Sequence, residues 1–135
     1  MYLLDTNVVS ELRKKNKANS GVKTFFSKVA TEETAVYISA ITIGELRRGV
    51  ELIRYRGDEG QALLLETWLN NIVCNYKDNI LEFSEPEAQV WGTLRVPHYE
   101  NALDKQVAAT ALTYNLSLVT RNISDFESTG ARLTD

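Results

Sequence analysis

Four acidic residues stand next to the ends of short apolar or helical segments: Asp5, Glu45, Asp104 and Asp125. Asp5 directly follows the apolar residues 1–4. Glu45 comes shortly after a second apolar run and Asp125 after a third, whereas Asp104 lies in the first turn of an alanine-rich helical segment. If the runs are parallel strands, the acids meet outside the carboxyl ends of those strands, where open α/β sheets bind ligands.

Carboxylates gathered in one crevice repel each other unless cations hold them together. Hard divalent ions such as Mg²⁺ or Mn²⁺ accept such oxygen ligands. The chemistry that uses this arrangement most is phosphodiester hydrolysis, in which bound metal activates water and clamps the attacking and leaving oxygens. This chemistry needs neither a histidine base nor a covalent nucleophile, which suits a chain with one histidine and one cysteine.

Asp5 and Glu45 also have purely structural interpretations. Asp5 is of a type that favours helix N-caps, although Thr6 or Asn7 could take that role instead. Thr42 and Glu45 have the spacing of a capping box, in which the glutamate bonds back to the cap residue. The two interpretations of Glu45 conflict, because one carboxylate can hardly cap a helix and serve a metal site together.

The other two acids have structural interpretations of their own. Asp104 would interact favourably with the dipole at the start of its helix. Asp125 would be an ordinary acid in a solvated turn. Each interpretation is reasonable for a single acid, but jointly they weaken, because all four positions would converge at one edge of the same sheet.

The elements that must position these acids are short buried strands that alternate with amphipathic helices. Apolar runs too short for helices indicate strands over residues 1–4, 35–38 and 116–119, with a weaker fourth over 79–83. Between them lie six helical patterns; in one, Ile43, Leu46, Val50 and Ile53 share a face. Such alternation predicts an α/β fold: a single three-layer α/β/α domain over residues 1–135, with a central, mainly parallel sheet.

Composition narrows the classes of function further. The chain has 135 residues with a net charge of −3, which fits one domain and argues against gripping nucleic acid by bulk charge alone. One cysteine excludes an internal disulfide. The sequence contains neither a long apolar stretch nor a basic and apolar leader, so we expect a cytoplasmic protein with no membrane partner.

Several motifs, in this order and spacing, resemble PIN-domain proteins over nearly the whole chain. They are Asp5-Thr6-Asn7, Ile43-Gly44-Glu45-Leu46-Arg47-Arg48-Gly49, Trp91-Gly92, Asp104 before Val107-Ala108-Ala109-Thr110-Ala111, and Val119-Thr120-Arg121-Asn122 with Asp125-Phe126. More narrowly, they resemble VapC-type toxins of toxin–antitoxin pairs. The resemblance implies a metal-dependent endoribonuclease that cuts tRNA or another structured RNA. It also implies a homodimer, inhibited as a hetero-oligomer by a small VapB-like antitoxin whose tail covers the site.

The resemblance assigns a role to seven residues. By position, the family's acidic quartet corresponds to Asp5, Glu45, Asp104 and Asp125. Asp5 and Asp104 would be the main Mg²⁺ or Mn²⁺ ligands, Asp125 would serve a weaker second metal, and Glu45 would bind metal or position water. Polar residues that steady these carboxylates would be Thr6, Thr120 and Asn122. Related chains often continue to an Asn-Pro-Trp-like ending, whereas this sequence ends at Thr134-Asp135.

Three alternatives stay open at this point. The chain could be a PIN module that binds RNA or protein without cutting it. It could be a phosphatase of the haloacid-dehalogenase type, since Asp5 follows an N-terminal strand, but that chemistry needs a second aspartate where this chain has Asn7. DNA could be the substrate, because the metal chemistry acts on either backbone.

Two surface features also carry expectations. Arg13, Lys14, Lys15 and Lys17 form a basic run that is either a solvated helix end or a place for RNA phosphates, and the same holds for Arg47, Arg48, Arg95 and Arg121. The helices with Phe25, Phe26, Trp68 and Trp91 offer more apolar surface than a monomer of this size needs. This surplus supports the homodimer.

Overall fold

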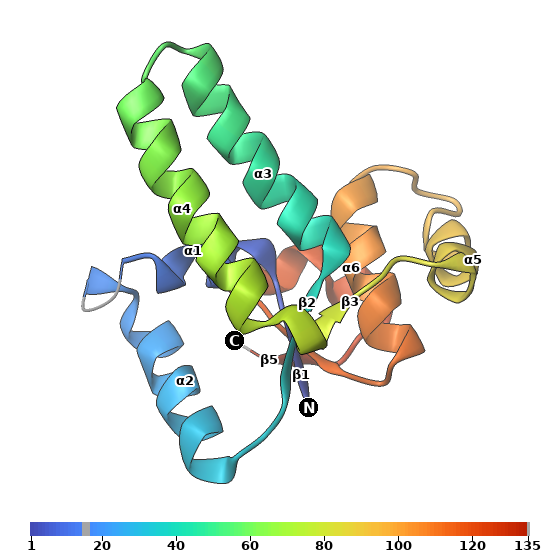
Figure 1. Ribbon diagram of the computed structural model, residues 1–135. Helices are drawn as coiled ribbons and strands as arrows, with labels where there is room; N and C mark the ends of the chain where they lie inside the picture. Colours follow the sequence, from blue (N-terminus) through green and yellow to red (C-terminus); the bar gives the residue numbers. More distant parts are fainter. Residues whose placement is uncertain (15–16, 135) are drawn as a thin grey trace.

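A five-stranded parallel sheet forms the centre of the molecule (Figure 1). The computed structural model describes residues 1–14 and 17–134. In spatial order the strands are β3 (Ile80–Leu81), β2 (Val36–Ser39), β1 (Tyr2–Leu4), β4 (Ser117–Val119) and β5 (Leu133–Thr134). Every neighbouring pair is parallel, and the N-terminal strand β1 lies in the middle.

Helices connect the strands, and each of the six helical patterns in the sequence lies in one of them. They are α1 (Thr6–Leu12), α2 (Ser20–Glu32), α3 (Ala40–Tyr55), α4 (Glu59–Asn75), α5 (Glu85–Leu94) and α6 (Ala102–Thr113). Short 3₁₀ turns are η2 (Lys77–Asn79), η3 (Ile123–Asp125) and η4 (Glu127–Thr129). No helix of the described residues combines the length and the apolar character needed to cross a membrane.

Helices cover both faces of the sheet. Successive strand residues point to opposite faces, so each strand contributes apolar side chains to two separate cores. Leu4 belongs to a core that joins the sheet to α1, α2 and the end of α4. Its neighbour Leu3 packs on the other face, against α6 and Phe126. In Figure 1, α1 and α2 lie to the left of the strands, and α5 and α6 lie to their right. The predicted three-layer α/β/α domain is confirmed.

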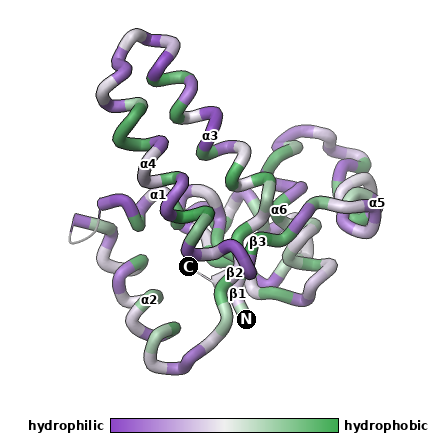
Figure 2. Tube along the Cα trace, viewed as in Figure 1, coloured by the Kyte–Doolittle hydropathy of each residue, from purple (hydrophilic) through white to green (hydrophobic). Residues whose placement is uncertain are grey.

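The α3–α4 hairpin extends beyond the sheet (Figure 1) and carries a small core of its own. Val50 and Leu65 face one another inside it. Arg47 and Arg54 on α3 both pair with Glu66 on α4, at 2.5 and 3.2 Å. Along both helices, hydrophobic and hydrophilic residues alternate in Figure 2, as expected where one face of each helix packs on the other.

The helices that suggested a surplus of apolar surface pack their aromatic side chains at least partly within the chain. Phe25 is 7% exposed and contacts Phe26 edge to face, at 5.2 Å between ring centroids. Trp68 packs against the cores of the sheet and of the α3–α4 hairpin. The Trp91 Nε1 donates to the Ala102 carbonyl at 3.0 Å. Leu63 and Leu64 on α4, the helix that carries Trp68, are nevertheless 56% and 68% exposed, so the homodimer stays a prediction.

Candidate active site

Asp5 lies at the carboxyl end of the central strand, and both of its oxygens are engaged. Its Oδ1 accepts a hydrogen bond from the Thr6 amide at 2.8 Å, so Asp5 itself caps α1. Its Oδ2 accepts from Thr120 Oγ1 at 2.9 Å, across 115 residues of sequence. Asp5 is therefore both the helix cap and a member of the acidic edge, and the idea that Thr6 or Asn7 could cap in its place is wrong.

Thr120 is fully buried just beyond β4 and fixes this arrangement. Its hydroxyl donates to Asp5 and accepts from the Asn122 amide at 3.0 Å. Asn122 thus contacts Thr120 through its backbone, whereas its side chain lies at an exposed position. Of the polar pair expected from the sequence, Thr120 contacts a carboxylate through its side chain, whereas Asn122 contributes only its backbone amide, to Thr120.

The start of α3 excludes the predicted capping box. Ser39 is the N-cap, and its Oγ accepts from the Ile41 amide at 3.1 Å. Thr42 therefore lies within the first turn, fully buried, three residues beyond the N-cap that the helix uses, whereas a capping box with Glu45 requires Thr42 to be the N-cap itself. The structural interpretation of Glu45 was wrong because the helix begins earlier than the Thr42 pattern suggested.

Glu45 instead contacts the N-terminal segment. Its Oε1 accepts from Thr6 Oγ1 at 3.1 Å, and Thr6 Oγ1 is also 3.3 Å from Thr42 Oγ1. Thr6 thus has the steadying contact that the sequence led us to expect. The sequence reasoning missed Thr42 as part of this network. Its signal, a hydroxyl in the first turn after a strand, was assigned to capping.

Asp104 and Asp125 complete the set from the other side of the sheet. Asp104 lies in the first turn of α6, and Asp125 ends η3 after β4. The pKa of Asp104 is raised to about 6, chiefly by burial and further by repulsion from Asp5, Asp125 and Glu45. Asp104 therefore lies close enough to the other three predicted acids to be repelled by each of them.

The pKa values of Asp5 and Glu45 are also raised, with burial as the largest cause in both cases. Hydrogen bonds from Thr120 and Thr6 counteract the rise at Asp5, and a bond from Thr6 does so at Glu45. Repulsion adds to the rise, from Asp125 at Asp5 and from Asp5 at Glu45. A cation at this edge would be favoured, because its positive charge would offset the cost of burying negative charges that also repel each other.

The spacing of the acids limits what kind of cation they could hold. Within residues 1–14 and 17–134, no group of three or more histidine, cysteine, aspartate or glutamate side chains is gathered closely enough to enclose a metal ion. Mg²⁺ usually keeps several waters and is held through one or two carboxylates. The all-oxygen donor set therefore fits a hydrated divalent ion better than an ion in a closed protein cage.

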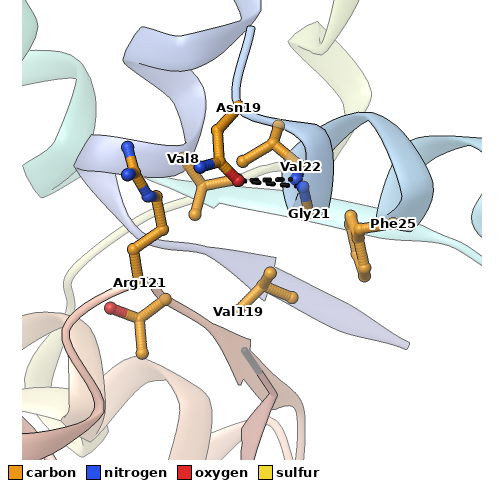
Figure 3. A pocket seen from close by; sticks show the side chains of 8 residues that line it. Val8, Asn19, Gly21, Val22, Phe25, Val119 and Arg121 are labelled. Carbon is orange, nitrogen blue, oxygen red and sulfur yellow. Dashed lines mark hydrogen bonds between the residues drawn. The ribbon is translucent and has the colours of Figure 1, made fainter.

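A cavity of ≈ 350 Å³ lies beside the acidic edge, between α1, α2 and the end of β4 (Figure 3). Its walls include the apolar Val8, Val22, Phe25 and Val119, and Arg121 stands at its border. Asn19 caps α2 at its rim, where Oδ1 accepts from the Gly21 and Val22 amides. Thr120 also lines this cavity and donates to Asp5, so the cavity adjoins the carboxylates.

A parallel sheet that ends in mutually repelling carboxylates places the molecule among α/β proteins with an acidic site. Residues 2–131 match the family model described as PIN domain. The chain belongs to the PIN-domain family, as its motifs led us to expect.

Two relatives by sequence bear names that indicate function. The chain is 34% identical to "Toxin FitB" of Neisseria gonorrhoeae over 131 residues, which cover 93% of this chain and 91% of that protein. It is 28% identical to "Ribonuclease VapC" of Rickettsia bellii over 96 residues, 67% of this chain and 68% of that protein. Family membership favours a nuclease over the phosphatase alternative.

Solved structures agree over the full length. A chain of FitAcB from Neisseria gonorrhoeae superposes with a TM-score of 0.84 at 31% identity, covering 100% of this chain and 97% of that one. A chain of a toxin–antitoxin complex from Klebsiella pneumoniae gives a TM-score of 0.62 at 25% identity, covering 100% and 97%. The fold is thus one that occurs in toxin–antitoxin complexes.

Proposed function

We propose that this protein is a divalent-metal-dependent endoribonuclease and the toxin of a toxin–antitoxin pair. The observation that carries the proposal is the electrostatic coupling of four carboxylates at one sheet edge, which raises the pKa of Asp104 to about 6. An acidic cluster of this kind is costly to the fold, and binding of Mg²⁺ or Mn²⁺ would offset that cost. Two relatives, one named as a toxin and one as a ribonuclease, support this proposed activity.

In this proposal Asp5 and Asp104 hold the main Mg²⁺ or Mn²⁺ ion, and the exposed Asp125 serves a weaker second position. When bound, the metal would lower the pKa of water and stabilise charge on the phosphodiester. Asp5 is suited to a fixed ligand position, because Thr6 and Thr120 hold it from two sides. Each carboxylate oxygen has two lone pairs, so these hydrogen bonds leave capacity for a metal.

Glu45 would position the attacking water or take its proton. Thr6 holds the Oε1 oxygen of Glu45, and this contact orients the carboxylate toward the same edge as Asp5. A raised pKa makes Glu45 a better proton acceptor than an ordinary glutamate. The chain thereby supplies a base without using its single histidine, His98, whose side chain is 77% exposed.

The proposed partners are an RNA substrate and a VapB-like antitoxin. tRNA or another structured RNA is the substrate class, and the protein would act on it in the cytoplasm. We further propose that the toxin is a homodimer that joins the antitoxin in a hetero-oligomer. Light scattering of the purified chain tests the dimer, and a mass near 15.2 kDa in dilute solution would contradict it.

The proposed activity is tested by incubating purified protein with tRNA in Mg²⁺ or in EDTA, for the wild type and Asp5→Asn. The wild type should cut only with metal, and Asp5→Asn should bind RNA without cutting it. Expression in a bacterial host should arrest growth for the wild type only. RNA bound but uncut by wild type in Mg²⁺ and Mn²⁺ would favour the non-catalytic alternative, and DNA cut in place of RNA would change the substrate class.

A further inference from the structure

A polar cavity of ≈ 440 Å³ lies between the end of α1 and the segment that follows β4. It is a separate cavity from the one shown in Figure 3, although Arg121 borders both. Hydroxyl, amide and charged side chains form its walls: Asn7, Ser10, Glu11, Arg13, Lys14, Arg121 and Asn122. None of the four acids of the proposed active site lines this cavity.

Glu11 is a buried residue of the cavity wall that holds two of the cations in place. Its side chain is only 7% exposed, and Oε1 accepts from Arg121 Nη1 at 2.8 Å and from Lys14 Nζ at 3.0 Å. Its Oε2 accepts from the Asn19 amide at 3.1 Å. The hydrogen bond from Lys14, followed by that from Asn19, lowers the pKa of Glu11, so the carboxylate is ionised at neutral pH. Two cations from separate segments are thereby fixed on the same wall.

These cations still face solvent. The side chains of Lys14 and Arg121 are 50% and 43% exposed, and Arg13 lies at an exposed position. A guanidinium has five N–H donors and an ammonium three, so one bond each to Glu11 leaves most of them available. Three cations against one carboxylate give the cavity a net positive charge in a protein that is acidic overall.

Three other arginines, Arg47, Arg54 and Arg95, are engaged within the fold, whereas Arg48 and Arg56 are exposed on α3 and at its end, away from this cavity. Arg47 and Arg54 share several glutamates in the α3–α4 hairpin. Arg95 lies 4.7 Å from the centre of the Trp91 ring and donates to the Tyr99 carbonyl. The basic run and Arg121, two features with open roles in the sequence, therefore meet at one place. Lys15 of that run lies outside the described residues.

Some residues of the cavity wall are close in sequence to residues of the acidic edge. Arg121 follows Thr120, whose hydroxyl holds Asp5, and the Asn122 amide donates to that same hydroxyl. Asn7 comes two residues after Asp5. In Figure 3 the Arg121 side chain extends from the end of β4 alongside Val8. A strand of nucleic acid that reaches the carboxylates would thus pass this cavity within a short distance.

We propose that this cavity binds a backbone phosphate of the RNA strand, one next to the phosphodiester that is cut. The proposal rests on the ribonuclease function proposed above. Arg121 would contact the phosphate with the N–H groups that Glu11 leaves free, and Lys14 and Arg13 would add charge. Because the acidic edge repels RNA, a fixed cationic site beside it supplies the attraction that the net charge of the chain lacks.

The test measures RNA binding without cleavage. Fluorescence anisotropy in EDTA gives the dissociation constant of a labelled single-stranded RNA oligonucleotide at several salt concentrations. The variants are Arg13→Gln, Lys14→Gln and Arg121→Gln, with Lys77→Gln as a matched control of equal charge. Lys77 is exposed in η2 before β3, at the opposite edge of the sheet. Thermal melting shows that each variant is folded, which matters most for Arg121, a partner of Glu11.

Each cavity variant should weaken binding several-fold at low salt and reduce the salt dependence by about one released counterion. Lys77→Gln should match the wild type. If the folded cavity variants also match the wild type, while the wild type cleaves tRNA in Mg²⁺, the cavity assignment is overturned and the ribonuclease proposal stands. A wild type that neither binds nor cuts RNA overturns both.

Discussion

Asp104 connects the geometry of individual residues to the behaviour of the site. It contributes a carboxylate to an edge that already holds Asp5, Glu45 and Asp125, and burial, followed by repulsion from these three, raises its pKa to about 6. A carboxyl group whose pKa is higher in the folded than in the unfolded chain binds its proton more tightly when folded. The free energy of unfolding of the metal-free protein should therefore fall as the pH rises from about 4 to about 6.

Asp104→Asn removes that cost. A rise in pKa of about 2 would correspond to about 3 kcal/mol for a fully desolvated group, and solvent screening at this half-buried side chain reduces it to about 1 kcal/mol. In metal-free buffer at pH 7, chemical denaturation should therefore find Asp104→Asn more stable than the wild type by about 1 kcal/mol, with no difference below about pH 4. A variant less stable at pH 7 would mean that Asp104 mainly complements the helix dipole.

Glu45→Gln separates chemistry from structure at a second position. The Glu45 carboxylate is not needed to cap α3, because Ser39 does so, and the amide oxygen of a glutamine can still accept from Thr6. The free energy of unfolding at pH 7 should not fall, because the change also removes a partly buried negative charge that Asp5 repels. tRNA cleavage should fall on the order of 100-fold or more, because the proton acceptor is lost. Cleavage at the wild-type rate would remove Glu45 from the proposed chemistry.

The four acids could be predicted from sequence because each follows a strand or opens a helix, and parallel strands end at one edge. The contacts that hold them could not. Thr120 donates to Asp5 across 115 residues, and Thr6 bonds Glu45 across 39. Such pairs depend on strand order and on the residue at which a helix begins, and neither follows from local pattern.

At the level of elements, the start of α3 shows how a boundary decides a side chain's role. Ser39 ends β2 and caps the helix at once, so no loop separates them. The sequence pattern pointed to Thr42 as the cap, because a glutamate lies three residues after it, whereas the helix uses Ser39. Thr42 is buried within the first turn, and its hydroxyl contacts Thr6.

Ser39→Ala should lower the free energy of unfolding by about 1 kcal/mol, because the Ile41 amide loses its partner at the start of α3. Ser27→Ala is the matched control, since Ser27 is exposed within α2, where alanine is at least as favourable as serine. Urea unfolding of both variants measures the difference. Equal stability of the two would assign the cap to another group.

At the scale of the whole molecule, the sequence was sufficient for the fold class and insufficient for its last details. Alternating strands and helices predicted a parallel sheet with two covered faces, and β1 to β4 coincide with apolar runs. β5 was missed because two residues, Leu133 and Thr134, carry no periodicity. The order β3-β2-β1-β4-β5 was also not predictable, because pairing is set by long-range packing.

The acidic edge should couple the stability of the whole domain to divalent metal. A ligand that binds only the folded state adds stability with the logarithm of its concentration, about 1.4 kcal/mol for each tenfold increase above the dissociation constant. Thermal melting at pH 7 over a range of Mn²⁺ concentrations should therefore raise the melting temperature of the wild type and of Lys77→Gln in parallel. Asp5→Asn and Asp104→Asn should gain little, because each loses a proposed ligand.

The same experiment separates a metal site from general screening. Screening of surface repulsion by a divalent salt would stabilise all four proteins, whereas a bound ion requires the two aspartates. Asp104→Asn should thus start more stable than the wild type without metal and fall behind it as Mn²⁺ is added, so that the two stability curves cross. Parallel curves for wild type and Asp104→Asn would show that Asp104 holds no metal, and the proposed ligand pair would have to be abandoned.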